Sequence, residues 1–150
     1  MEKDIKFKHS MPAQIRFSDV DQFGHVNNSV YFSLYDLGKT TYIKDVLGDA
    51  DWKKNAIVVA NINANFFAPV FFTDEILIQT KVTHLGNKSF TLLQRAVSAT
   101  THEVNCECRT IMVLYSLEEQ APIAIPDDYK QAISTYEGKS IEELSAKTES

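Results

Sequence analysis

The sequence predicts an α+β fold in which one long central helix is wrapped by a roughly five-stranded antiparallel sheet. Residues 29 to 47 contain no proline and space their apolar side chains as a helix does. Residues 56 to 117 hold four segments rich in β-branched and aromatic residues, and a further strand is expected before the helix. A single helix followed by a run of strands is typical of the α+β class.

Length and charge restrict the possible functions. A chain of 150 residues has the usual size of one domain, so we expect one domain over residues 1–150, with a core at about 7–130 and a helical tail at about 127–150. The net charge of -5 and the scattered basic residues argue against a nucleic-acid partner. No apolar run approaches the roughly 20 residues of a membrane span, and residues 1 to 10 lack a signal-type apolar core. These features predict a cytoplasmic protein with no membrane partner.

The first two elements follow from local patterns. Residues 5 to 17 include Pro12, which suits an edge strand or a strand broken by a bulge. The helix of residues 29 to 47 has an apolar row next to a tyrosine row, a surface wide enough to predict a largely enclosed helix; the two rows are Val30, Leu34, Leu37 and Thr41, and Tyr31, Tyr35 and Tyr42. Gly38 costs the helix about 1 kcal/mol relative to alanine, so we expect a close backbone approach there. Gly48 is a plausible C-terminal stop.

Four strands are expected after a polar loop at residues 49 to 55. Their ranges are 56–67, 74–85, 89–100 and 103–117. Gly86 and Asn87 between two apolar runs are a strong hairpin signal. Cys106 and Cys108 share one strand face, where a mutual disulfide would be strained, so reduced thiols are expected. Residues 127 to 148 fit one or two short exposed helices.

The most informative segment is residues 19 to 28, directly before the helix. It combines the carboxylates of Asp19 and Asp21 with the imidazole of His25, and it ends in two asparagines. The free N–H groups and the positive dipole end of a helix lie beside these side chains, an arrangement that can polarise a carbonyl. Asp21 is the candidate catalytic group, whereas Asp19 is better explained as a structural hydrogen-bond acceptor for the loop.

This segment resembles the signature of the hotdog-fold acyl thioesterases, in particular the 4-hydroxybenzoyl-CoA thioesterase-like family. The residues 25 to 28 are also similar to plant and bacterial acyl-ACP thioesterases. The matching features cover roughly residues 7 to 130; they are Ile15, Arg16, Phe17, Tyr31, Phe32, Asp36, the run 67–70 with Asp74, the run 85–90, and Ile125 with Pro126. The resemblance implies a hotdog domain in which two protomers pair edge to edge, as a homodimer or a tetramer of dimers.

The resemblance also implies catalytic roles. The aspartate that matches Asp21 attacks the thioester or activates water, and a backbone N–H near Asn28 holds the thioester oxygen as an oxyanion hole. His25 either orients Asp21, protonates the thiolate or contacts the acyl carbonyl, or it only fixes the loop. Phe23 stands where acyl-ACP thioesterases carry a catalytic asparagine, which weakens a claim of the same three-residue machinery.

The expected substrate-binding residues lie around this segment and on one strand. Gly24 allows a tight turn with the backbone near a ligand, and Asn27 or Asn28 is a natural N-cap. Tyr31 is expected at the acyl tunnel. Asn61, Asn63 and Asn65 alternate on one strand face and are expected to line the acyl pocket of the partner, with an exposed polar face as the alternative.

No metal or cofactor is predicted. His102, Cys106 and Cys108 share a strand face, but their spacing fits no established zinc pattern. Phosphate-binding glycine loops, dinucleotide fingerprints and serine nucleophile elbows are missing from the sequence. The phosphates of CoA would therefore meet scattered basic residues, such as Arg16, Lys88 or Arg95.

The sequence thus predicts a hydrolase, an acyl-CoA thioesterase that releases a free acid and CoA. An acyl-ACP thioesterase is the first alternative, because both substrates present the same phosphopantetheine arm. A non-catalytic acyl-binding hotdog dimer is the second. Large aromatic side chains on the helix and the next strand shorten an acyl pocket or stack on a ring, whereas His25 and Asn27 resemble those of enzymes that act on fatty acyl thioesters. Together these features favour short or medium fatty acyl groups over aromatic ones.

Overall fold

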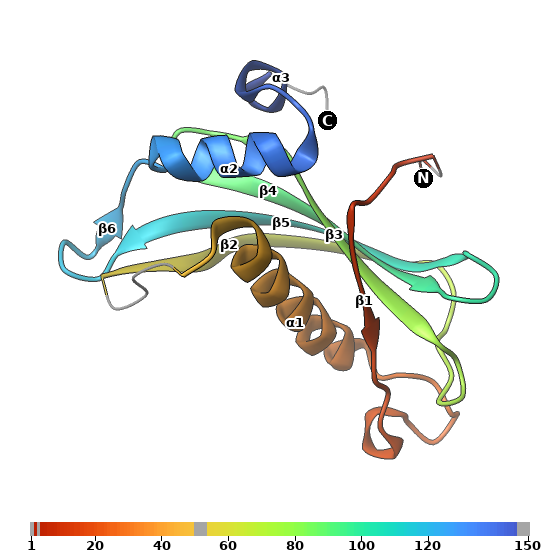
Figure 1. The fold of residues 1–150 in the computed structure, drawn as a ribbon. Coiled ribbons are helices and arrows are strands. Elements are labelled where there is room, and N and C mark those ends of the chain that lie inside the picture. The colour runs from red at the N-terminus through yellow and green to blue at the C-terminus, as the bar shows by residue number, and fades with distance from the viewer. Residues whose placement is uncertain (1, 3, 50–53, 147–150) are drawn as a thin grey trace. The chain divides into compact units, whose positions relative to one another are not determined.

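A computed structural model describes residues 2, 4–49 and 54–146 of the chain. Its elements are β1 (His9–Ala13), the 3-10 helix η1 (Phe17–Asp19), α1 (Asn28–Leu47), β2 (Asn55–Phe66), β3 (Ile76–Leu85), β4 (Ser89–Ser98), β5 (Val104–Ser116), β6 (Ala121–Pro122), α2 (Asp127–Glu137) and α3 (Ile141–Ser145) (Figure 1). Most of the loop predicted at residues 49 to 55 and the last four residues of the tail lie outside the described residues.

Backbone pairing joins the strands in the order β1-β3-β4-β5-β2, and the short β6 pairs with β5. The pairing of β1 with β3 is antiparallel and runs from His9 opposite Thr80 to Ala13 opposite Ile76. The predicted α+β class, with one long helix and a mostly antiparallel sheet, is confirmed. The two-residue strand β6 was not predicted, because so short an element carries no periodicity in the sequence.

The chain divides into two compact units, which are described separately. The first comprises Met1–Tyr42, Ala64–Lys81 and Gln94–Cys108, and the second comprises Ile43–Asn63, Val82–Leu93 and Arg109–Ser150. The expectation of a single domain over residues 1–150 stays a prediction. None of the helices in the described part of the chain has the length and apolar character that a membrane span requires.

The buried face of α1 is narrower than predicted, because of the two predicted rows only the tyrosine row is fully buried. Tyr31, Tyr35 and Tyr42 are at most 3% exposed, whereas Leu37 from the predicted apolar row is 52% exposed. The helix is therefore not largely enclosed in this chain by itself. The tyrosine row is buried because it lies on the face that also carries Gly38, where residues of β3 and β4 contact the helix.

Gly38 lies where α1 packs on β3 and β4. A Cβ added at this glycine would lie 2.8 Å from Cγ2 of Ile78 and 3.0 Å from Nε2 of Gln94, closer than side chains pack. Gln94 Nε2 also donates hydrogen bonds to the main-chain oxygen of Tyr35 and to Oγ1 of Thr80. The close backbone approach expected at Gly38 is confirmed.

Both cysteines are buried and free in the structure, and their reduced state stays a prediction. Burial raises the pKa of the Cys106 thiol to about 11.

The helices α2 and α3 of the second unit were predicted to be exposed, but each of them buries one apolar side chain. These side chains are Ile133 in α2 and Leu144 in α3. Helix α2 ends at Gly138, which has a φ of 69° and donates its N–H to the main-chain oxygen of Ser134.

Candidate active site

The loop before α1 is a narrow antiparallel turn. The N–H of Asn27 donates to the oxygen of Asp19 at 2.9 Å, and the N–H of Asp21 donates to the oxygen of His25 at 2.8 Å. Gly24 closes the turn with a φ of 79°, and its N–H donates to the oxygen of Asp21. Because a side chain at this φ would be strained, glycine is the residue that allows so tight a turn.

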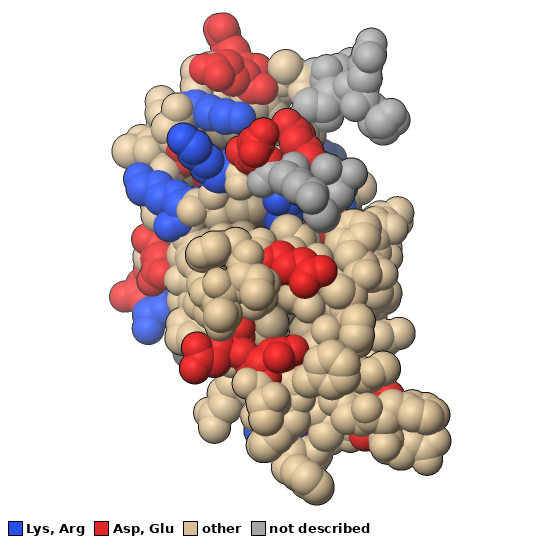
Figure 2. Space-filling model, turned by 90° about the vertical axis from the view of Figure 1, so that its right-hand side faces the viewer, with Lys and Arg blue, Asp and Glu red and all other residues tan. Residues whose placement is uncertain are grey.

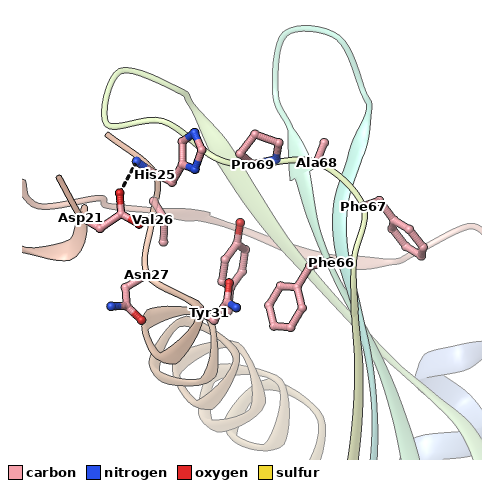
Figure 3. A pocket seen from close by; sticks show the side chains of 10 residues that line it. Asp21, His25, Val26, Asn27, Tyr31, Phe66, Phe67, Ala68 and Pro69 are labelled. Carbon is pink, nitrogen blue, oxygen red and sulfur yellow. Dashed lines mark hydrogen bonds between the residues drawn. The ribbon is translucent and has the colours of Figure 1, made fainter. Parts of the chain in front are cut away.

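The carboxylate of Asp21 is oriented by its own loop. Its Oδ1 accepts hydrogen bonds from the main-chain N–H of Phe23 at 2.9 Å and of His25 at 3.2 Å (Figure 3). Its Oδ2 has no hydrogen-bond partner among the residues that the structure describes. One oxygen of Asp21 thus fixes the orientation of the carboxylate, while the other is available to a substrate or a water molecule.

Asp19 has the structural role predicted for it. Its Oδ2 accepts the main-chain N–H of Arg16 at 2.8 Å, and its Oδ1 lies 3.1 Å from a guanidinium nitrogen of the same residue. The main-chain hydrogen bond from Arg16, followed by that from its guanidinium, lowers the pKa of Asp19 below its usual value.

Arg95, one of the basic residues suggested as ligands of the CoA phosphates, is not available for that role. It is 2% exposed, and its guanidinium is paired with the carboxylate of Glu107 at 2.7 Å.

The start of α1 combines a cap with an open N–H group. Asn27 Oδ1 accepts the main-chain N–H of Ser29 at 3.1 Å, and the oxygen of Asn27 accepts the N–H of Val30 at 2.9 Å. Of the two predicted caps, Asn27 is therefore the N-cap. The main-chain N–H of Asn28 has no acceptor within the described part of the chain. It lies at the positive end of the helix dipole, where it can stabilise a developing oxyanion.

These groups border a cavity of about 370 Å³ within the first unit. The lining residues are Asp21, His25, Val26, Asn27, Asn28, Tyr31, Phe66, Phe67, Ala68 and Pro69. The structure thus gathers five of the predicted site residues, and the roles predicted for them stay predictions. The remaining four are not among the lining residues, and their substrate-binding role also stays a prediction; these are Gly24, Asn61, Asn63 and Asn65.

Tyr31 is, with Val26, one of the buried residues that line the cavity. It is 3% exposed, and its ring meets the ring of Phe66 edge to face at a centroid distance of 5.3 Å. Figure 3 shows this tyrosine between Val26 on one side and Phe66 on the other. Burial raises the pKa of Tyr31 to about 12, so its hydroxyl stays protonated near neutral pH and can donate a hydrogen bond.

The ring of His25 packs against aromatic neighbours. It lies edge to face with Phe71 at 5.0 Å between centroids, and it is tilted against Phe23 at 6.4 Å. The main chain of His25 also forms an antiparallel bridge with that of Phe71. The residue therefore contributes to holding the loop, and a direct chemical role for its ring stays a prediction.

Large apolar side chains are exposed in η1 and in the loop before α1. Phe17 is 81% exposed and Phe23 is 71% exposed. On the face drawn in Figure 2, uncharged residues form a broad surface in the lower part, which small groups of acidic side chains interrupt. No lysine or arginine occurs among the residues that line the cavity.

Sequence reasoning missed part of one cavity wall. Phe66 at the end of β2 and Phe67 after it line the cavity and are among the aromatic residues expected near the acyl tunnel. Ala68 and Pro69 complete this wall, and only their place in a family-like run marked them in the sequence. No feature of the sequence predicted that Val26 would line the cavity. In the described ranges, no three side chains of histidine, cysteine, aspartate or glutamate are grouped closely enough to hold a metal ion.

Comparison with known proteins agrees with this geometry. The curated protein YsmA of Bacillus subtilis, which is uncharacterised, is 31% identical over 78 residues, which are 52% of this chain and 53% of that protein. The acyl-CoA thioester hydrolase YbgC of Escherichia coli is 25% identical over 118 residues, covering 77% of this chain and 87% of that protein. A crystal structure of a thioesterase from Thermus thermophilus, complexed with coenzyme A and Zn, is 25% identical with a TM-score of 0.77 and covers 89% of this chain and 96% of its own.

The family is identified by the match of a family model. The model described as the Thioesterase-like superfamily matches residues 15–133, which include the loop before α1, all of α1 and strands β2 to β6. The resemblance stated from the sequence is thereby confirmed, as is the hotdog fold. The chain belongs to the thioesterase-like superfamily of hotdog-fold enzymes.

Proposed function

We propose that this protein hydrolyses acyl-CoA thioesters to a free acid and CoA. The observation that carries the proposal is that the Asp21 carboxylate and the open main-chain N–H of Asn28 border the same cavity. A thioesterase needs a nucleophile or base on one side of the thioester carbonyl and an oxyanion-stabilising donor on the other. Membership of the thioesterase-like superfamily supports this function.

The available atoms suggest the following chemistry. The thioester oxygen accepts the N–H of Asn28, and Oδ2 of Asp21 either attacks the carbonyl carbon or removes a proton from an attacking water. The carbon–sulfur bond then breaks, the acyl group leaves as an acid and the thiolate of CoA takes up a proton. If Asp21 is the nucleophile, water hydrolyses the acyl-enzyme anhydride in a second step. His25 borders the same cavity and is proposed to contact the reacting carbonyl or to supply this proton.

The remaining predicted residues are proposed to bind substrate. The turn at Gly24 brings loop backbone toward the pantetheine arm, Asn27 holds the helix start, and Tyr31 bounds the acyl group together with Phe66. The cavity volume of about 370 Å³ lies near the lower end of the range of roughly 300–1,000 Å³ for small-molecule sites. Because the partner is proposed to complete the acyl pocket, the preference for short or medium fatty acyl groups rests on the aromatic rings of Tyr31 and Phe66 at the cavity.

A homodimer, or a tetramer of dimers, is the proposed assembly. Strand β2 ends the pairing order of the sheet and leaves Val59 44% and Ile62 41% exposed. An open edge with apolar side chains is a site for pairing with another chain. In such a dimer, Asn61, Asn63 and Asn65 of β2 would line the acyl pocket of the partner. Light scattering after size exclusion tests this proposal, and an active monomer would contradict it.

Acyl-ACP is the alternative substrate. A carrier protein would be favoured by a basic patch at the cavity mouth, whereas the residues that line the cavity include no lysine or arginine. A comparison of kcat/KM for one acyl group on CoA and on the carrier protein distinguishes the two. The second alternative, a non-catalytic acyl-binding dimer, predicts binding of acyl-CoA without any release of thiol.

The decisive experiment is hydrolysis of a panel of acyl-CoAs by the wild type and by Asp21→Asn, with thiol release as the readout. Asparagine keeps an oxygen for the N–H groups of Phe23 and His25, so the loop stays folded. We expect the variant to lose about 10²–10⁴-fold in kcat with little change in substrate binding. Asp128→Asn on the exposed surface of α2 is the matched control. Turnover by Asp21→Asn near the wild-type rate would disprove the assignment.

A further inference from the structure

One asparagine outside the cavity holds one of its walls. The main-chain oxygen of Asn105 in β5 accepts the N–H groups of Phe67 at 2.8 Å and of Ala68 at 3.1 Å. The side-chain Nδ2 of Asn105 donates to the main-chain oxygen of Pro69 at 3.2 Å. Three consecutive wall residues are thus bonded to one residue, which is only 6% exposed.

The same wall is hydrogen-bonded at its other end to the loop before α1, which carries Asp21. The oxygen of Val70 accepts the main-chain N–H of Val26 at 2.7 Å. Val26 follows His25, whose main chain is bonded to Asp21 in both directions. Hydrogen bonds, together with the covalent chain between neighbouring residues, therefore connect β5 through residues 67 to 70 to the loop that carries the Asp21 carboxylate.

The side chain of Asn105 makes one hydrogen bond within the described part of the chain, the one to Pro69. Its Oδ1 is buried and has no hydrogen-bond partner among the described residues. A buried acceptor without a partner costs about 1–3 kcal/mol, whereas an apolar side chain of similar shape would carry no such cost. The asparagine side chain donates a hydrogen bond from Nδ2 to the main-chain oxygen of Pro69, which a leucine side chain cannot do.

We propose that Asn105 is a specificity-determining positioning residue, which through Pro69 fixes the wall of residues 66 to 69 against the acyl group. This inference rests on the proposed function. The side chains of Phe66 and Phe67 are 44% and 48% exposed, so hydrogen bonds hold this wall more than side-chain burial does. A displaced wall changes the contacts of the acyl group, while Asp21 and Asn28 keep their own hydrogen bonds and positions. Loss of the Asn105 side-chain hydrogen bond should therefore change KM and the preference among acyl groups, and it should change kcat little.

The test compares two matched replacements of a buried amide by leucine. Asn105→Leu removes the donor to Pro69. Gln94→Leu is the control, because Gln94 is likewise buried with an unpartnered Oε1. The Nε2 of Gln94 donates to Tyr35 and Thr80, and neither residue lines the cavity. If Asn105→Leu does not fold, Asn105→Ala replaces it, because alanine also lacks the donor.

The kinetic readout is KM, kcat and the preference among acyl-CoAs of increasing chain length. We expect Asn105→Leu to raise KM for the best substrate by about three- to tenfold, the size of effect that one lost hydrogen bond produces. It also weakens the discrimination against longer acyl groups and changes kcat by less than about twofold. Gln94→Leu keeps the wild-type KM and preference. Unchanged KM and preference in Asn105→Leu, or equal changes in both variants, would overturn the proposal.

Amide hydrogen exchange provides a readout that does not need turnover. We expect the N–H groups of Phe67 and Ala68 to exchange faster in Asn105→Leu than in the wild type and unchanged in Gln94→Leu. If the wild type hydrolyses no acyl-CoA, the proposed function has failed, and exchange alone decides the positioning role. Equal exchange rates at both amides in Asn105→Leu and wild type would then refute it.

Discussion

Gly38→Ala is expected to destabilise the protein although alanine is the better helix former. The new Cβ would lie 2.8 Å from Cγ2 of Ile78 and 3.0 Å from Nε2 of Gln94. Ile78 is 1% exposed and Gln94 is 0% exposed, so neither has open space into which to move. Overpacking of this kind, together with the weakened hydrogen bonds of Gln94, costs about 3 kcal/mol, and the gain in helix propensity returns about 1 kcal/mol.

The net loss in the free energy of unfolding is therefore about 2 kcal/mol, which lowers Tm by about 4–8 °C in a chain of this size. Urea unfolding and calorimetry measure it, with Ser33→Ala on the exposed face of α1 as the control that changes propensity alone. In an Ile78→Ala background, which removes the nearest atom, Gly38→Ala should cost at least about 1 kcal/mol less. A Gly38→Ala protein as stable as the wild type would refute the reasoning.

Three further outcomes are expected. Glu107→Gln leaves the buried guanidinium of Arg95 without its counter-charge and should lower the free energy of unfolding by about 3 kcal/mol; a loss below about 1 kcal/mol would contradict this. Because the folded pKa of Asp19 is lowered, its contribution is fully present above the ordinary value of 3.8 and is lost as pH falls through the folded value. The stability difference between wild type and Asp19→Asn should therefore shrink from about pH 6 to about pH 3 in urea titrations. Burial and the raised pKa of Cys106 should protect its thiol from an aromatic disulfide reagent in the native protein, and labelling as fast as in urea would count against this.

Much of the candidate site could be predicted from the sequence because its pieces are local. Asp21, His25 and the helix start lie within eight residues, and the turn at Gly24 needs only short-range hydrogen bonds to form. The helix stop at Gly48 and the strands around the Gly86-Asn87 turn also follow from patterns shorter than a dozen residues. Turns, helix ends and short-range hydrogen bonds of this kind can be predicted from residue type and spacing.

Other features were decided only by the tertiary structure. Helical spacing alone did not show that the tyrosine row of α1 would be buried and Leu37 exposed, because that choice depends on which face the sheet approaches at Gly38. The pairing of Arg95 with Glu107 removed a candidate phosphate ligand that the sequence could not exclude. The bonds from Asn105 to the wall at residues 67 to 69 join positions more than 30 apart in the chain. Strand pairing brings such distant residues together through main-chain N–H and C=O groups, which every residue except proline carries. The side-chain pattern of the sequence therefore does not show which distant residues will meet.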